Sequence, residues 1–213
     1  MTPLLLGHRG ARASRHIPEN SLDSFELCLQ HGCDGFEFDV RLSRDGEAVV
    51  CHDPAVGRVK IAAVGAATLS LPRLEQVLEQ FAHRAFLDIE LKVAGLERQT
   101  LAALAKHPPQ KGYVVSSFLP EVLLAIRHLG SSIPLGHLCD TRAQLRAWRD
   151  IPSEWVIPRC DLASQELIQQ IHEAGRKAMV WTVNRAANMI EFANWNVDAI
   201  ISDQTELLVR SLR

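Results

Sequence analysis

The stretch Gly35-Phe36-Glu37-Phe38-Asp39-Val40 alternates apolar and acidic residues with the two-residue period of a β-strand. Successive strand side chains point to opposite faces, so Glu37 and Asp39 share one face and the apolar residues share the other. A strand this apolar is expected to be buried, and a buried carboxylate without a partner is costly. The pair therefore predicts a cation held between two carboxylates.

A second segment, Gly7-His8-Arg9-Gly10, follows the apolar run 3–7 and places a histidine and an arginine at the end of an expected strand. Arginine presents a planar fork to phosphoryl oxygens, and histidine exchanges protons near neutral pH. A cation beside these two side chains indicates chemistry on an anionic, phosphorylated substrate.

Apolar strand-like runs alternate with amphipathic helix-like runs along the chain, which predicts a parallel sheet covered by helices. Strands are expected near residues 3–8, 34–41, 47–52, 85–92, 112–117, 133–138, 155–158, 177–183 and 198–202. Helices are expected near residues 21–31, 71–82, 95–106, 120–129, 141–149, 164–174, 186–194 and 205–212. Either an open doubly wound sheet or a closed barrel has this order of elements.

About eight strand–helix units favour the closed TIM (β/α)8 barrel. The chain has 213 residues, near the lower end of the usual barrel length, which is about 200 to more than 400 residues. No GxGxxG motif opens the first helix, which argues against a doubly wound nucleotide-binding fold. We predict a single α/β domain over residues 1–213, with a short insertion after the His52-Asp53 motif.

Local signals predict where several helices begin. The polar turn Pro18-Glu19-Asn20-Ser21 can cap the helix that follows it. Pro72 is expected in the first turn of the next helix, where its missing N–H does no harm. Ser164 and Thr205 are expected to be N-caps.

The composition of the chain limits which binding partners and which cellular location we expect. Hydrophobic residues make up 47% of the chain and the net charge is −2, which predicts a globular protein and excludes a basic nucleic-acid surface. No apolar run approaches the roughly 20 residues of a membrane span. The N-terminus lacks a basic signal-peptide region, and the five cysteines form no CxxC pair. We therefore predict a cytoplasmic protein that binds neither nucleic acid nor membrane.

Polar residues gather where the expected strands end. These residues are His8, Arg9, Glu37, Asp39, His52, Asp53, Glu90, Lys92, Ser116, Ser117, Trp181 and Asn184. One such residue alone is usually structural, and an isolated Glu-Leu-Lys is commonly a solvated salt bridge. Their joint position at the carboxyl ends of barrel strands indicates one site.

These residues form an ordered set of motifs that runs through most of the chain. The motifs are His8-Arg9-Gly10, Pro18-Glu19-Asn20-Ser21, Glu37-x-Asp39, Asp45-Gly46, Val49-Val50-x-His52-Asp53, Glu90-Leu91-Lys92, Ser116-Ser117-Phe118 and Trp181-Thr182-Val183-Asn184. With this set the sequence resembles the glycerophosphodiester phosphodiesterase family. The resemblance implies a TIM barrel, one divalent cation, and hydrolysis of glycerophosphodiesters to glycerol 3-phosphate and an alcohol.

The resemblance assigns Glu37, Asp39 and Glu90 to the metal. The chemistry agrees, because three carboxylates with waters form a hard oxygen site that suits Mg²⁺ or Ca²⁺ rather than Zn²⁺. The sequence leaves the choice between Mg²⁺ and Ca²⁺ open.

The resemblance also assigns His8 and His52 to acid–base catalysis, and Arg9 and Lys92 to the phosphate side of the pocket. Two histidines with pKa values near neutral can divide deprotonation of the nucleophile from protonation of the leaving alkoxide. Which histidine is the acid stays open, as does the nucleophile, water or the glycerol 2-hydroxyl. Trp181 is expected to bind substrate through the glycerol carbons, although a core role is nearly as consistent with its position.

The chain departs from the family pattern mainly between Asp53 and Leu71, where the family commonly has a longer insertion. The short segment Pro54–Ser70 predicts an open pocket mouth on the alcohol side, and so soluble, deacylated diesters as small-molecule substrates. The alternatives are a related phosphodiesterase acting on lysophospholipids or phosphoinositides, a non-catalytic glycerophosphodiester-binding barrel, and an unrelated isomerase or aldolase barrel. The sequence leaves the leaving alcohol and the oligomeric state open.

Overall fold

The computed structural model describes residues 2–130 and 132–213. Its barrel strands are β1 (Leu4–His8), β2 (Gly35–Leu42), β6 (Phe86–Leu91), β7 (Tyr113–Ser117), β8 (Leu135–Cys139), β9 (Trp155–Pro158), β10 (Lys177–Val180) and β11 (Ala199–Ser202). Its helices are α1 (Leu22–Gln30), α2 (Leu74–Phe81), α3 (Glu97–Lys106), α4 (Pro120–His128), α5 (Arg142–Arg146), α6 (Gln165–Glu173), α7 (Ala186–Asn194) and α8 (Thr205–Leu212).

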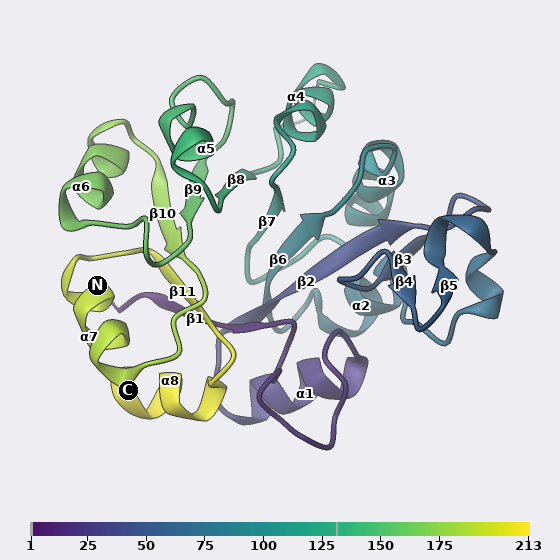
Figure 1. Ribbon diagram of the computed structural model, residues 1–213, viewed down its shortest axis with the longest axis horizontal. Helices are drawn as coiled ribbons and strands as arrows, with labels where there is room; N and C mark the ends of the chain where they lie inside the picture. The colour runs from purple at the N-terminus through teal and green to yellow at the C-terminus, as the bar shows by residue number, and fades with distance from the viewer. Residues whose placement is uncertain (1, 131) are drawn as a thin grey trace.

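In the described part of the chain, eight parallel strands form a closed barrel, because β1 pairs with both β2 and β11. The other strand neighbours follow chain order around the ring. Figure 1 shows the strands at the centre and the helices outside them. The predicted TIM barrel is therefore confirmed. Since all eight strands run in one direction, their carboxyl ends meet at one face, where barrel sites are built.

One predicted strand, near residues 47–52, lies outside the ring. Its middle forms β3 (Ala48–Val50), which pairs antiparallel with β2. The residues between β3 and α2 are folded into short elements, namely the hairpin strands β4 (Ala55–Val56) and β5 (Val59–Lys60) and the 3₁₀ helices η1 (Ile61–Ala63) and η2 (Ala66–Thr68). Buried Ile61 packs against Val49 of β3, which anchors this insertion beside the barrel.

Alternation along β2 places the acidic residues. Phe36 and Phe38 are fully buried on its outer face beneath α1, and the rings of Phe36 and Phe25 stack with centroids 4.2 Å apart. Glu37 and Asp39 therefore point the other way, into the barrel. β2 and β6 pack closely where β2 begins, because a Cβ on Gly35 would lie 1.8 Å from the Phe86 carbonyl oxygen. Only glycine permits this approach.

The predicted helical position of Pro72 is wrong. Helix α2 begins at Leu74, with Arg73 as its N-cap. The carbonyl of Pro72 instead accepts a hydrogen bond from the Val50 N–H at 2.8 Å. This segment therefore lies along the edge of the sheet before the helix starts. The sequence pattern alone does not reveal this pairing.

The predicted cap at Thr205 is also wrong, because Thr205 is the first residue of α8 and Gln204 is its N-cap. The Thr205 hydroxyl instead lies 2.7 Å from Nδ1 of His31 on α1. Ser21 and Ser164 are N-caps as predicted, and each hydroxyl accepts a backbone N–H from three residues further along. The Thr205 side chain thus contacts a distant residue and does not cap its own helix.

Two predicted elements continue about three residues beyond the ends that the structure gives them. Helix α5 ends at Arg146 and strand β10 ends at Val180, so the residues after each of them belong to connecting turns. Of the helices that the structure describes, none has both the length and the apolar character needed to cross a bilayer.

Candidate active site

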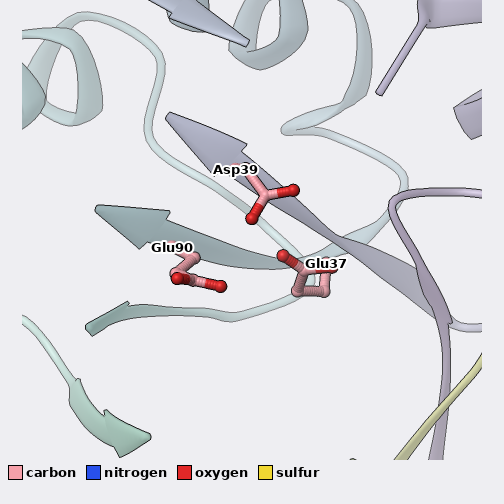
Figure 2. Close-up of side chains that lie close together, drawn as sticks. All are labelled: Glu37, Asp39 and Glu90. Atoms are coloured by element: carbon pink, nitrogen blue, oxygen red, sulfur yellow. The ribbon is translucent and has the colours of Figure 1, made fainter. Parts of the chain in front are cut away.

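Three carboxylates converge at the carboxyl end of the barrel. Glu37 and Asp39 come from β2, and Glu90 comes from the adjacent strand β6, where it pairs in register with Asp39. Figure 2 shows the three side chains pointing toward one another. One oxygen from each carboxylate lies within 4.8 Å of the others, and their residues are 4%, 1% and 6% exposed. The structure therefore brings together the three residues that the sequence predicts as metal ligands.

Two cations and one amide contact this cluster. Lys92 Nζ lies 2.6 Å from a Glu90 oxygen and 3.3 Å from an Asp39 oxygen. Arg9 Nε lies 3.3 Å from the other Asp39 oxygen, and the Asn20 amide donates to that oxygen at 2.8 Å. Asp39 is thus the best neutralised of the three carboxylates.

The pKa values in the cluster follow this arrangement. Burial and then the Asp39 charge raise the pKa of Glu90 to about 8. The same two causes raise the pKa of Glu37 well above its usual range. Burial also acts to raise the pKa of Asp39, but the nearby Lys92 and Arg9 outweigh it and lower that pKa. Without a metal ion, Glu37 and Glu90 therefore hold their protons more tightly than exposed carboxyls do, because the protein cations mainly neutralise Asp39.

The donor set fits a hard divalent cation. Among the described residues, Oε1 of Glu37 is buried without a hydrogen-bond partner. Oxygens less than about 5 Å apart can share an ion with the 2.0–2.6 Å bonds of Mg²⁺ or Ca²⁺. The buried, unpartnered oxygen and the all-oxygen ligands agree with the cation expected from the sequence.

A fourth carboxyl, Asp88, lies beside the cluster on β6, two residues before Glu90, and was not singled out from the sequence. It pairs in register with Glu37 and is fully buried. Burial raises its pKa to about 7, although the Ser116 hydroxyl donates to it at 2.6 Å and lowers the pKa. Asp88 is not among the described residues that line the cavity, so it is a buried neighbour of the cluster and not part of its open face.

His8 ends β1 and is held by a distant residue. Its Nδ1 lies 2.8 Å from Oδ1 of Asp203, and its Nε2 lies 3.9 Å from Glu37. A carboxylate can only accept, so Nδ1 carries a proton and Nε2 faces the acidic cluster. Asn184 donates to the second Asp203 oxygen at 2.6 Å. His8 and Asn184 lower the Asp203 pKa well below its usual range against the opposing effect of burial.

Asp203 was missed by sequence reasoning. It directly follows β11, as His8 ends β1, so its place after a barrel strand was the available signal. That signal becomes specific only once the barrel closes β1 against β11 and brings residues 8 and 203 together.

Arg9 takes an unusual backbone conformation, with φ at +53°. The left-handed turn directs its backbone N–H to Glu37 Oε2 at 3.0 Å, while its guanidinium reaches Glu19 at 2.8 Å. Non-glycine residues rarely adopt this conformation unless their surroundings hold them in it. The contacts that hold Arg9 place it at the edge of the acidic cluster.

His52 follows β3 and lines the same cavity as His8. Its Nδ1 lies 2.8 Å from Asp53 Oδ1, and its side chain is 34% exposed. The Arg41 Nε donates to the His52 carbonyl at 2.7 Å. Burial lowers the pKa of His52, although Asp53 acts in the other direction. His52 thus has the same Nδ1–carboxylate anchor as His8, in a more open position.

A cavity of about 330 Å³ joins these groups. Its charged wall contains His8, Arg9, Glu37, His52, Glu90 and Lys92. Asp39 lies beneath this wall. An apolar part of the lining contains Phe118 and Trp181, whose ring centroids are 5.5 Å apart. Trp181 Nε1 donates to the Ile157 carbonyl at 3.1 Å, so its polar edge is fixed and its ring faces the cavity.

The geometry agrees with the relatives of this sequence. The family described as the glycerophosphoryl diester phosphodiesterase family matches residues 8–78 and 70–207. The chain belongs to this family. The matched residues include the strand-end histidines and all three carboxylates of the cluster. The family expectation and the enzyme class, a phosphoric diester hydrolase, are confirmed.

Individual relatives match along their whole length. A glycerophosphodiester phosphodiesterase from Caldanaerobacter subterraneus subsp. tengcongensis is 27% identical over 249 residues, covering 100% of this chain and 99% of the relative. A phosphodiesterase from Oleispira antarctica, solved with the product sn-glycerol-3-phosphate, is 26% identical with a TM-score of 0.85, covering 99% and 96%. A glycerophosphodiester phosphodiesterase from Parabacteroides distasonis is 22% identical with a TM-score of 0.88, covering 99% and 97%, and this likeness supports the fold.

Proposed function

We propose that this chain is a metal-dependent glycerophosphodiester phosphodiesterase that releases glycerol 3-phosphate and an alcohol. The observation that carries the proposal is the joint placement of three buried carboxylates, two histidines and two cations around one cavity. Glu37, Asp39 and Glu90 would hold one Mg²⁺ or Ca²⁺. When bound, the ion supplies positive charge that stabilises the phosphoryl oxygens in the transition state.

His8 and His52 transfer the protons. Each has Nδ1 fixed by a carboxylate, so each presents Nε2 as its reactive nitrogen. One imidazole removes the proton of the nucleophile, and the other protonates the leaving alkoxide. Both imidazoles line the cavity, and they come from different parts of the chain, one at the end of β1 and the other after β3.

Arg9 and Lys92 hold the phosphate. Arg9 lines the cavity with a guanidinium that Glu19 and Asp39 orient, and this fixed fork suits two phosphoryl oxygens. Lys92 adds a second positive charge beside Glu90 and also orients that carboxylate. Trp181 and Phe118 form the apolar wall, against which the glycerol carbons pack.

We expect soluble, deacylated diesters to be the substrates, with modest discrimination among their alcohols. The insertion after His52 is short and none of its described residues lines the cavity, so it leaves the alcohol side open. The product held by the Oleispira antarctica relative, sn-glycerol-3-phosphate, matches the half that the charged wall would select. A cytoplasmic location stays a prediction from the sequence.

The test is a panel of glycerophosphocholine, glycerophosphoethanolamine and glycerophosphoglycerol, with glycerol 3-phosphate release measured by a coupled dehydrogenase. Lysophospholipid and intact phospholipid vesicles are the comparison substrates, and Mg²⁺ and Ca²⁺ are tested separately after chelation. We expect kcat/KM values within about tenfold for the three diesters and far lower values for both lipids. Full activity in excess chelator, or a marked preference for a lipid, would contradict the proposal.

A further inference from the structure

Arg12 connects two carboxylates that belong to different parts of the active face. Its Nε donates to Glu19 Oε2 at 2.6 Å, and its Nη1 donates to Asp203 Oδ1 at 3.1 Å. Glu19 lies in the loop between β1 and α1, whereas Asp203 follows β11 at the other end of the chain. A guanidinium is well suited to this task, because it offers several N–H donors in one rigid plane.

Each of these carboxylates holds a residue of the charged wall. Asp203 lies 2.8 Å from Nδ1 of His8, and Glu19 lies 2.8 Å from Nη1 of Arg9. The result is a continuous series of contacts, from His8 through Asp203, Arg12 and Glu19 to Arg9. Arg9 in turn lies 3.3 Å from Asp39 Oδ2, so the series ends on the carboxylate cluster.

Arg12 itself is remote from the reacting groups. His8 and Arg9 line the cavity, while Arg12 lies behind them with a side chain that is 39% exposed. An ion pair this exposed is screened by solvent and contributes little to folding stability. The contribution of Arg12 is therefore geometric: Asp203 and Glu19 each have one oxygen engaged by Arg12, which restricts the rotation of both carboxylates.

We propose that Arg12 is a positioning residue that fixes His8 through Asp203 and Arg9 through Glu19. The inference rests on the proposed phosphodiester hydrolysis, and it adds a residue that touches neither metal nor substrate. Without Arg12, Glu19 loses one of its two guanidinium contacts, and Asp203 keeps only His8 and Asn184. A displacement of about 1 Å in a reacting group can cost about 10²-fold in rate.

The two hydrogen bonds of Arg12, to Asp203 and to Glu19, predict different kinetic effects. Release of His8 impairs proton transfer and lowers kcat, whereas release of Arg9 weakens phosphate binding and raises KM. Arg12→Met keeps an unbranched side chain like the apolar stem of arginine and removes both hydrogen bonds, so it should change both parameters. We expect kcat to fall about 10- to 100-fold and KM to rise several-fold. Arg12→Lys restores charge without the planar fork and should recover only part of the loss.

Arg84→Met is the matched control. Arg84 pairs with Glu26 through its guanidinium and is exposed to a similar extent, 36% against 39%, but it contacts Phe81 and Glu26, away from the cavity. This variant should stay within about twofold of the wild type in kcat and KM, as expected for an exposed ion pair. Thermal melting of all variants, with rates measured well below their melting temperatures, separates positioning from loss of fold.

A readout that needs no activity completes the experiment. Long-range ¹H–¹⁵N spectra of the His8 ring report the proton on Nδ1, which the wild type should retain and Arg12→Met should exchange or lose. If wild-type protein fails to hydrolyse every glycerophosphodiester, the proposed function is wrong, and the spectra still test the inference. If Arg12→Met matches Arg84→Met in kcat and KM, or its His8 signals equal those of the wild type, the inference is overturned.

Discussion

Nδ1 of His8 lies 2.8 Å from Oδ1 of Asp203, although the two residues are 195 positions apart in the chain. The contact fixes the proton on Nδ1 and leaves Nε2 facing the cavity. Asp203→Asn keeps the shape of the side chain, but its amide can donate to Nδ1 and so favour the wrong tautomer. We expect kcat to fall about 10²- to 10⁴-fold with native melting behaviour, measured by steady-state kinetics on glycerophosphocholine. Unchanged kcat would show that His8 needs no orienting carboxylate.

Removal of any one metal carboxylate should weaken cation binding. Glu37→Gln, Asp39→Asn and Glu90→Gln keep volume and delete one charge from a cluster whose oxygens lie within 4.8 Å of one another. Titration calorimetry with Mg²⁺ and with Ca²⁺ should show affinity losses of at least about 10-fold, since even the loss of a residue that only orients a metal ligand lowers metal affinity that much. Asp88→Asn is the control, because that acid accepts a hydrogen bond from Ser116 and belongs neither to the three-carboxylate group nor to the cavity lining. If Asp88→Asn lowered cation affinity equally, the three carboxylates would no longer be distinguished as the metal ligands.

The raised acid pKa values predict a pH-dependent effect of the metal on stability. Without metal, folding raises the pKa of Glu90 to about 8 and that of Asp88 to about 7, and Glu37 shifts the same way. The folded state then holds protons that the unfolded state has released, so these groups make stability fall as pH rises from about 4.5 through 8.

A bound cation replaces those protons. Melting curves between pH 6.5 and 8.5 should therefore show an increase in melting temperature on adding Mg²⁺ or Ca²⁺ that grows with pH. The window avoids the range in which Asp39, Asp203 and Glu19 titrate, because their pKa values are lowered and their stabilisation is lost only in acid. A metal-induced increase in melting temperature that is constant over this range would count against the cluster as the binding site.

The two cavity histidines should be far more sensitive than those on helices. His8→Ala and His52→Ala should each lower kcat about 10²- to 10⁴-fold, the usual contribution of a general acid or base. His31→Ala and His172→Ala should stay near the wild-type rate, because His31 contacts Thr205 and His172 contacts Asp198 away from the cavity. Comparable losses in all four variants would show that the strand-end histidines have no special role.

Arg9→Lys tests whether the guanidinium fork matters or only its charge. Lysine keeps the charge but cannot engage Glu19, Asp39 and two phosphoryl oxygens from one plane. We expect KM for glycerophosphocholine to rise by about 10-fold or more, as for the loss of a charge-assisted hydrogen bond. Wild-type kinetics in this variant would assign Arg9 a purely structural role.

The fold was predictable because the hydrophobic periodicity of the sequence indicates where its strands and helices lie. Alternation of Phe36 and Phe38 with Glu37 and Asp39 predicts which face enters the barrel, and the order of strand-like and helix-like runs predicts the ring. The position of Pro72 was not predictable, because its carbonyl pairs with Val50 of β3 across the loop. The residues next to Pro72 in the sequence do not indicate that Val50 is its hydrogen-bond partner.

The same limit applies to the site. Residues at the ends of apolar strands were found, since motif and strand end coincide. Asp203, Arg12 and Asp88 were missed because their importance comes from contacts with His8, Glu19 and the barrel interior. Those contacts exist only after residues far apart in the chain have been brought together.

The ring closes only when β1 gains β11 as its second neighbour. During synthesis on the ribosome, His8 emerges 195 residues before its partner Asp203. Nascent chains that lack β11 therefore contain the three clustered carboxylates in a barrel that cannot close, and His8 without its partner. Products whose synthesis stops before β11 and Asp203 should thus be inert toward glycerophosphodiesters.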